Sequence, residues 1–133
     1  MEEVKKQGVE SLFCPYEQAL SLNELGFDEP CFMIYYDGTN ELRGSIHFLY
    51  SRDIKAPLYQ QAFRWFRSKY SICVEIHQTT DWEEDNESWS FVIFKYRLGN
   101  NDGMVNSIID YDTYEEAELA CLDKLIDIVK NKN

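Results

Sequence analysis

The chain has 133 residues, 13 of them basic and 24 acidic, and a formal net charge of −11. This length predicts a single domain over residues 1–133. Residues 1–11 show no clear hydrophobic period, so we expect them to form a loosely ordered tail. The 44% apolar and 28% charged residues are typical of a globular protein, which excludes disordered, collagen-like, coiled-coil and disulfide-scaffold classes. No apolar run approaches the about 18 residues of a membrane span, and no secretory signal follows Met1–Glu10. We therefore expect a cytoplasmic protein.

The four cysteines, Cys14, Cys31, Cys73 and Cys121, are widely spaced, and no Cys-x-x-Cys motif occurs. This spacing predicts neither a zinc ribbon nor a redox pair. We expect free thiols, most of them packed as small hydrophobic side chains.

The first helix is predicted from about Pro15 to Leu25. Proline suits the first helical position, where its missing N–H would have no partner. Gly26 marks the end of the helix, and the apolar residue after it, Phe27, fits a Schellman motif.

A β-hairpin is predicted next, because Asp37-Gly38 is a strong turn signal between two apolar segments. Its strands are Cys31–Asp37 and Leu42–Tyr50.

Helical and strand periods then alternate to the end of the chain. The segment Pro57–Tyr70 carries apolar residues at helical spacing, and Ile72–His77 alternates as a strand does. Thr113-Tyr114-Glu115-Glu116 is a capping box, which predicts the start of the last helix. Two further strands are expected between these elements, at Trp89–Leu98 and, as an optional fifth strand, at Met104–Ile109.

The predicted order is α-β-β-α-β-β-(β)-α. Hairpins imply antiparallel pairing, so the fold class is α+β, a two-layer sandwich with an antiparallel sheet covered by helices. Pro15 and Pro57 are separated by 42 residues, as are Cys31 and Cys73. An internal helix–hairpin duplication is one interpretation of these equal offsets.

Three stretches together resemble a known group of proteins: PYEQALSLNELGFDEPC (15–31), PLYQQAFRWFR (57–67) and TYEEAELACLDKLIDIVK (113–130). The group consists of small proteins without an assigned activity, encoded in phage and mobile-element genomes of gut anaerobes. The resemblance implies a cytoplasmic protein of an accessory genome, where small acidic binders and inhibitors are common. It carries no catalytic signature, so no residue role follows from it.

No pattern predicts a catalytic, metal or cofactor site. Cys73, Glu75 and His77 share one face of a predicted strand, but the cysteine and the histidine are about 13 Å apart, too far for a nucleophile and its base. With His47 as a third ligand, Glu75 and His77 could share a metal if the two strands were neighbours, but an exposed polar strand face is the favoured interpretation. We expect no catalytic residues, no metal and no cofactor; an enzyme of unrecognised type is the remaining alternative.

Residues 51–78 differ from the rest of the chain, with five basic and two acidic residues. Arg64, Arg67, Lys69 and Trp65 form a basic and aromatic group on the predicted helix Pro57–Tyr70. Arginine and aromatic residues anchor protein interfaces and stacked bases. In the alternative interpretation, the aromatic residues are core and the basic residues pair with acidic groups.

The sequence thus favours a non-enzymatic protein-interaction module with an unknown protein partner, as a monomer or homodimer. In its sharper form this hypothesis holds that acidic residues imitate a phosphate backbone and inhibit a DNA-binding protein. The alternative is a small nucleic-acid-binding protein that uses Pro57–Tyr70, although the negative net charge disfavours nucleic acid. The acidic residues expected in such a mimic are Glu83, Glu84, Asp85 and Glu87, with Glu115, Glu116 and Glu118.

Overall fold

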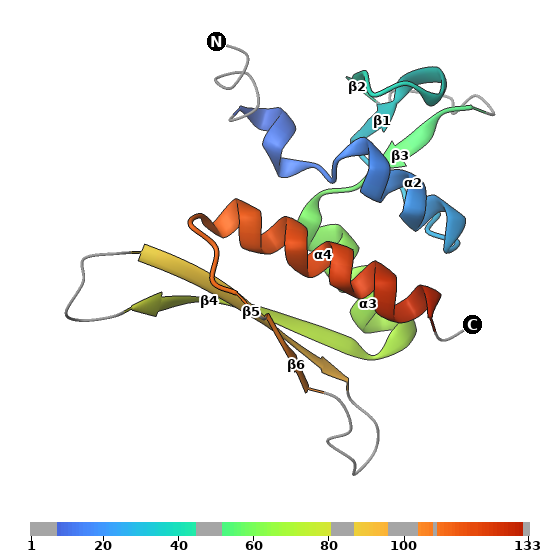
Figure 1. The fold of residues 1–133 in the computed structure, drawn as a ribbon. Helices are drawn as coiled ribbons and strands as arrows, with labels where there is room; N and C mark the ends of the chain where they lie inside the picture. The colour runs from blue at the N-terminus through green and yellow to red at the C-terminus, as the bar shows by residue number, and fades with distance from the viewer. Residues whose placement is uncertain (1–7, 45–51, 81–86, 96–103, 108, 132–133) are drawn as a thin grey trace. The chain divides into compact units, whose positions relative to one another are not determined.

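A computed structural model describes residues 8–44, 52–80, 87–95, 104–107 and 109–131 (Figure 1). The chain divides into two compact units, residues 1–62 and 63–133, and each unit is described by itself. Helix α3 (Tyr59–Tyr70) contains the boundary between them. The prediction of a single domain stays a prediction.

The described part of the first unit contains η1 (Val9–Leu12), α2 (Tyr16–Glu24), η2 (Tyr36–Gly38) and three strands. The short helix η1 lies partly within residues 1–11, which we expected to be a loose tail. Strands β1 (Met33–Tyr35), β2 (Leu42–Gly44) and β3 (Ile54–Ala56) form an antiparallel sheet of order β2-β1-β3.

Helix α2 ends in the predicted Schellman motif. The N–H of Phe27 donates to the Leu22 carbonyl at 2.9 Å, and that of Gly26 donates to Asn23 at 3.1 Å. Gly26 has a φ of 101°, a conformation that L side chains rarely adopt. The helix packs on its sheet through a small buried cluster of Ala19, Tyr35, Ile54 and Ala56.

The predicted hairpin turn is confirmed. Asp37 and Gly38 have positive φ values of 49° and 71°, and Asp37 N–H donates to Asp53 Oδ1 at 2.8 Å. The strand predicted over Leu42–Tyr50 is observed at Leu42–Gly44, and its later residues lie outside the described ranges.

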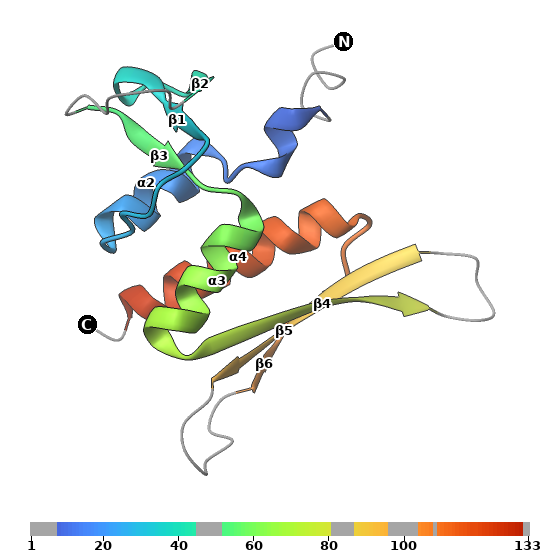
Figure 2. The same ribbon diagram turned by 180° about the vertical axis from the view of Figure 1, so that it is seen from behind.

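The second unit contains the rest of α3, β4 (Ile72–Thr80), β5 (Glu87–Lys95), β6 (Met104–Asn106) and α4 (Tyr114–Lys130). The sheet is antiparallel with order β4-β5-β6, and β4 pairs along its whole length with β5. Figures 1 and 2 show α4 lying over one face of this sheet. That face contributes the buried side chains Ile72, Phe91 and Ile93.

The N-terminal cap of α4 is also as predicted, because Thr113 Oγ1 accepts from the Glu116 N–H at 3.1 Å. The segment before the helix is held to β5 by two backbone hydrogen bonds between Trp89 and Tyr111, of 2.8 and 2.7 Å. The inner side of α4 is apolar, with buried Ala117, Cys121, Leu122, Leu125, Ile126 and Val129.

The α+β class and the antiparallel pairing are confirmed. The strands form two three-stranded sheets where the sequence indicated one, and β3 was not predicted. The optional fifth strand is present as β6. Within the described ranges, both units place three strands after a helix, but their sheet orders differ, so a simple duplication does not describe the topology of these strands.

Candidate functional site

The residues of the predicted basic and aromatic group on α3 differ in exposure. Arg64, Arg67 and Lys69 are exposed, whereas Trp65 is buried at 7% exposure. Lys69 Nζ lies 5.0 Å from the Trp65 ring centroid and 5.5 Å from that of Tyr70, so its charge rests against aromatic faces. The helix therefore presents basic side chains to solvent without an exposed tryptophan.

The predicted acidic group is only partly described. Glu83, Glu84 and Asp85 lie outside the described residues, and of Glu87 the structure describes the backbone, as the first residue of β5. Glu115 and Glu116 are exposed on α4, as expected.

The prediction that Glu118 belongs to an exposed acidic surface is wrong, because its side chain is only 8% exposed. It follows Ala117 on the inner side of α4, four residues before Leu122. Burial, together with the nearby charge of Glu115, raises the pKa of the Glu118 carboxyl to about 7.

Among the described residues of the second unit, most of the exposed charged side chains lie on the outer side of α4 and on the segment before it. We call the exposed carboxylates here the α4 acidic surface: Asp110, Asp112, Glu115, Glu116, Asp123 and Asp127. The exposed basic residues on the same stretch are Lys124 and Lys130. The surface is held in place because the opposite side of the helix is buried.

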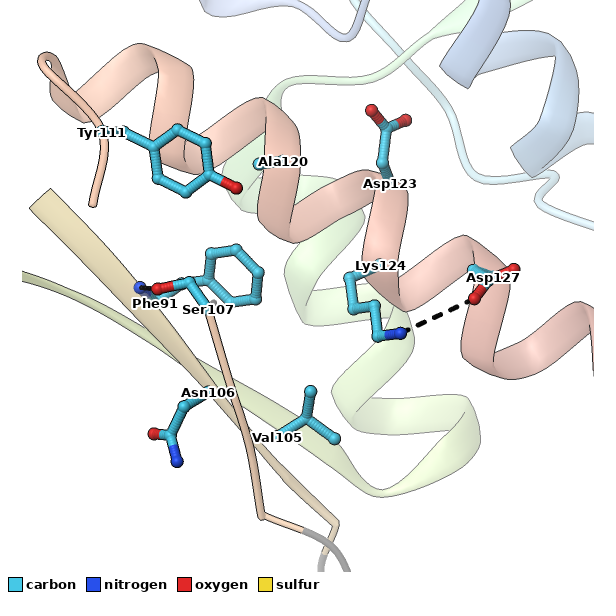
Figure 3. Close-up of a pocket in the computed structure, with 9 residues that line it drawn as sticks. All are labelled: Phe91, Val105, Asn106, Ser107, Tyr111, Ala120, Asp123, Lys124 and Asp127. Carbon is cyan, nitrogen blue, oxygen red and sulfur yellow. Dashed lines mark hydrogen bonds and ion pairs between the residues drawn. The ribbon is translucent and has the colours of Figure 1, made fainter. Parts of the chain in front are cut away.

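A hollow of about 410 Å³ adjoins this surface, between α4 and the β5–β6 edge of the sheet (Figure 3). Its apolar wall includes Phe91 and Tyr111, whose rings stack with centroids 6.3 Å apart. Ser107 Oγ accepts from the Phe91 N–H at 3.2 Å. The remaining lining residues are Val105, Asn106, Ala120, Asp123, Lys124 and Asp127.

The charged groups of the hollow lie on its α4 side. Lys124 Nζ pairs with Asp127 Oδ2 at 3.8 Å, and Figure 3 shows the Asp123 carboxylate pointing away from the strands. The hollow thus combines an apolar wall with a charged rim. That combination suits an apolar side chain flanked by charged ones.

The outer face of the second sheet, opposite α4, carries a polar cluster. Ser90 Oγ lies 2.8 Å from His77 Nε2, and His77 Nδ1 lies 3.8 Å from Glu75 Oε1. The contacts connect a serine to a histidine and the histidine to a carboxylate, as in a hydrolytic triad. Acyl transfer also needs N–H donors for an oxyanion, and the N–H of the next residue, Phe91, is already bonded to Ser107.

Among the described residues, no group of three or more His, Cys, Asp or Glu side chains could hold a metal ion. His47, the third ligand considered from the sequence, lies outside those ranges. Within the same ranges, no helix is long and apolar enough to cross a membrane.

Sequence reasoning missed the hollow and Ser90. The hollow is formed by residues from β5, β6 and α4, which no local pattern groups together. Ser90 meets His77 through the cross-strand register, 13 residues away along the chain. An alternating pattern in both strands was the available signal, and it does not fix the register.

Comparison with known proteins gives no match to a family model, a curated protein or a solved structure.

Proposed function

We propose that this protein is a non-enzymatic, cytoplasmic protein-interaction module of phage or mobile-element origin, whose α4 acidic surface binds a basic protein. In the sharper form, the surface occupies the nucleic-acid-binding site of that protein and inhibits it. The observation that carries the proposal is the position of the acidic surface beside the apolar hollow.

Charge alone gives steering and little specificity, because exposed ion pairs contribute only about 0–1 kcal/mol each. An apolar anchor contributes more, since burial of a leucine side chain is worth about 1.5–3 kcal/mol. The hollow offers Phe91, Val105 and Ala120 to such an anchor. We therefore expect the partner to present a basic segment with an apolar residue at its centre.

The rigidity of α4 supports this role. Its capped first turn and its buried side fix the spacing of the exposed carboxylates before binding. A preorganised surface loses less conformational entropy on association than a flexible acidic tail does.

The proposal is tested first with two arginine-rich peptides of equal charge, one with a central leucine and one with alanine there. The leucine peptide should bind about tenfold more tightly, in proportion to the apolar area buried. Equal affinities would show that the hollow is not used and would contradict the proposed site.

Two variants with the same net charge separate the effect of the α4 acidic surface on binding from the effect of the net charge. Glu116→Gln/Asp123→Asn/Asp127→Asn removes three charges from the surface, and Glu10→Gln/Glu17→Gln/Glu24→Gln removes three exposed charges from the first unit. The first variant should lose peptide binding and the second should retain it. The same pair, immobilised in host lysate, should differ in the capture of a basic nucleic-acid-binding protein. Equal behaviour of the two variants would overturn the proposal.

The alternative, nucleic-acid binding through Pro57–Tyr70, has less support. Arg64 and Arg67 are exposed and suited to phosphate contacts, but the buried Trp65 is not available to stack on a base. A gel shift at low salt, abolished by Arg64→Gln/Arg67→Gln, is the result that would favour this alternative. Its affinity should then fall steeply as salt is raised.

A further inference from the structure

Strand β4 is the outer strand of the second sheet, and its free side is long. The strand order is β4-β5-β6, and β4 pairs with β5 over all nine residues without a bulge. No described residue pairs with its other side. Native proteins protect such edges with proline, lysine, bulges or short strands. Ile72–Thr80 has none of these, and its one acidic residue is Glu75.

The backbone hydrogen bonds of β5 reveal which β4 groups point outward. Trp89 exchanges both of its backbone hydrogen bonds with Tyr111, and the carbonyl of Phe91 accepts from Ser107 N–H at 2.9 Å. These groups point away from β4. In an antiparallel pair, opposite residues either exchange both hydrogen bonds or exchange none. The residues opposite Trp89 and Phe91, which are Gln78 and Ile76, therefore direct their N–H and C=O groups to the open edge.

The same alternation extends along the strand. Every second residue of β4 offers a donor and an acceptor to the open side: Ile72, Val74, Ile76, Gln78 and Thr80.

We propose that a second copy of this chain pairs with this edge, β4 against β4 and antiparallel, to form a continuous six-stranded sheet. The twofold axis passes through Ile76, the middle residue of the strand. In this register the outward-pointing residues face one another: Ile76 lies opposite its own copy, and Val74 lies opposite Gln78 of the second copy. All the outward donors and acceptors of both strands are then satisfied.

The side chains favour the same register. Glu75 lies opposite His77 of the second copy, and by symmetry the pair occurs twice. These are non-hydrogen-bonded positions, where Cα atoms approach to about 4.5 Å and side chains interact most closely. An imidazole N–H and a carboxylate form a hydrogen bond there without any change in the rest of the strand.

The neighbouring registers are worse on two counts. Moving the axis to residue 75 places Glu75 opposite its own copy, which is a like-charge pair. Moving it to residue 77 places the two His77 side chains opposite each other. Both shifts shorten the paired segment. A shift that pairs even-numbered with odd-numbered residues leaves the outward N–H and C=O groups without partners.

The pairing brings a second carboxylate near one polar atom that lacks a hydrogen bond. His77 Nδ1 is a buried side-chain nitrogen without a hydrogen-bond partner among the described residues, and Glu75 of the same chain lies 3.8 Å away. Ser90 already occupies Nε2. A buried polar atom without a partner is uncommon in folded proteins. The second copy brings a further carboxylate to this histidine.

The pairing does not involve the α4 acidic surface, so the two proposals succeed or fail independently. The peptide-binding experiments test α4, whereas those below test only the mass and the register of a dimer.

The first experiment measures the molar mass of the full chain by sedimentation velocity across the micromolar range. The wild-type chain should reach twice its 15.8 kDa mass as concentration rises. Gln78→Pro removes an outward donor while the bonds to β5 remain, as proline on an edge strand does. It should stay monomeric, whereas Gln78→Thr should dimerise like the wild type.

Charge variants test the register. His77→Glu places carboxylates opposite each other at both symmetric pairs and should weaken dimerisation about tenfold. Glu75→Lys removes both attractions and should also weaken it. An equimolar mixture of the two variants restores an attractive pair at both positions, a carboxylate with an imidazole N–H at one and a carboxylate with a lysine at the other. A heterodimer should therefore form in preference to either homodimer. This rescue also shows that both variants are folded.

A disulfide gives the most direct test. In the proposed register Cys73 lies opposite Thr79 of the second copy, within the Cα separation that a disulfide requires. Thr79→Cys, oxidised by copper phenanthroline, should give a covalent dimer in which the new thiol is linked to Cys73. Within one chain the two positions are about 20 Å apart along the strand, too far to be bridged.

A wild-type chain that remains monomeric, a dimer that Gln78→Pro leaves intact, or a linkage of the new thiol to any other cysteine would each overturn the proposal.

Discussion

The hydroxyl of Tyr35 donates to the carbonyl oxygen of Cys14 at 2.6 Å, and both residues are buried. The N–H of Cys14 donates in turn to the Pro57 carbonyl at 2.8 Å. The segment before α2 is therefore tied to β1 by a side chain and to the residue after β3 by the backbone. These two hydrogen bonds hold the start of α2 next to β1 and to the end of β3.

Tyr35→Phe should destabilise the first unit by about 1–2 kcal/mol, because the buried Cys14 carbonyl loses its side-chain donor. The measurement is urea denaturation followed by far-UV circular dichroism. Tyr16→Phe is the matched control, since its hydroxyl donates to Gly38 at 2.9 Å at an exposed position. If both substitutions cost the same, the buried hydrogen bond of Tyr35 stabilises the first unit no more than an exposed one does.

Thr113→Ala should cost about 1 kcal/mol, because Glu116 N–H then loses its acceptor at the first turn of α4. Thr113→Ser keeps a hydroxyl at the same place and should cost much less. The free energy of unfolding from chemical denaturation measures both. A loss as large for serine as for alanine would assign the effect to the threonine methyl group instead.

The four cysteines should differ sharply in their rates of alkylation at mildly alkaline pH. The thiolate is the reactive form, and burial raises the pKa of Cys31 to about 11 and that of Cys121 to about 12. Cys14 and Cys121 are fully buried, whereas Cys73 lies half-buried on the outer face of β4. Peptide mapping after brief iodoacetamide treatment should find Cys73 modified first and Cys121 last.

In the denatured chain all four thiols should react at similar rates, which provides the control. Modification of Cys121 before Cys73 in the folded protein would contradict the burial that the structure assigns to α4.

Structural features that depend only on neighbouring residues were predicted well from the sequence. The boundaries at Gly26 and Thr113 depend on backbone groups within one helical turn, so neighbouring residues determine them. Pro15, expected at the first helical position, is instead the extended N-cap residue with a ψ of 161°, and α2 begins one residue later at Tyr16. The alternation of β4 is likewise local. These features needed no knowledge of what the elements pack against.

Features that depend on distant contacts were not predicted. Strand β3 has three residues, too few for a visible period, and exists because β1 pairs with it some twenty residues earlier in the chain. Trp65 was placed with the arginines because helical spacing brings them near each other, but burial separates its ring from their solvent-exposed face. The Ser90–His77 contact depends on the hairpin register, which alternation leaves open.

Glu118 should make stability depend on pH between about 4.5 and 7. Its folded-state pKa is raised to about 7 from the ordinary 4.5, first by burial and then by the charge of Glu115. The folded state therefore holds the proton more tightly than the unfolded state does. The contribution is fully present below pH 4.5 and is lost as the pH rises through 7, a total loss on the order of 3 kcal/mol.

Glu118→Gln keeps the shape and removes the ionisation, so it should abolish this part of the pH dependence and raise the stability above pH 7. Glu116→Gln removes one charge from an exposed position of the same helix and is the matched control. Urea denaturation of the three proteins at several pH values measures the slope. If the slope between pH 4.5 and 7 is the same in Glu118→Gln as in the wild type, the carboxyl is hydrated in solution and α4 packs less closely at this position than the structure indicates.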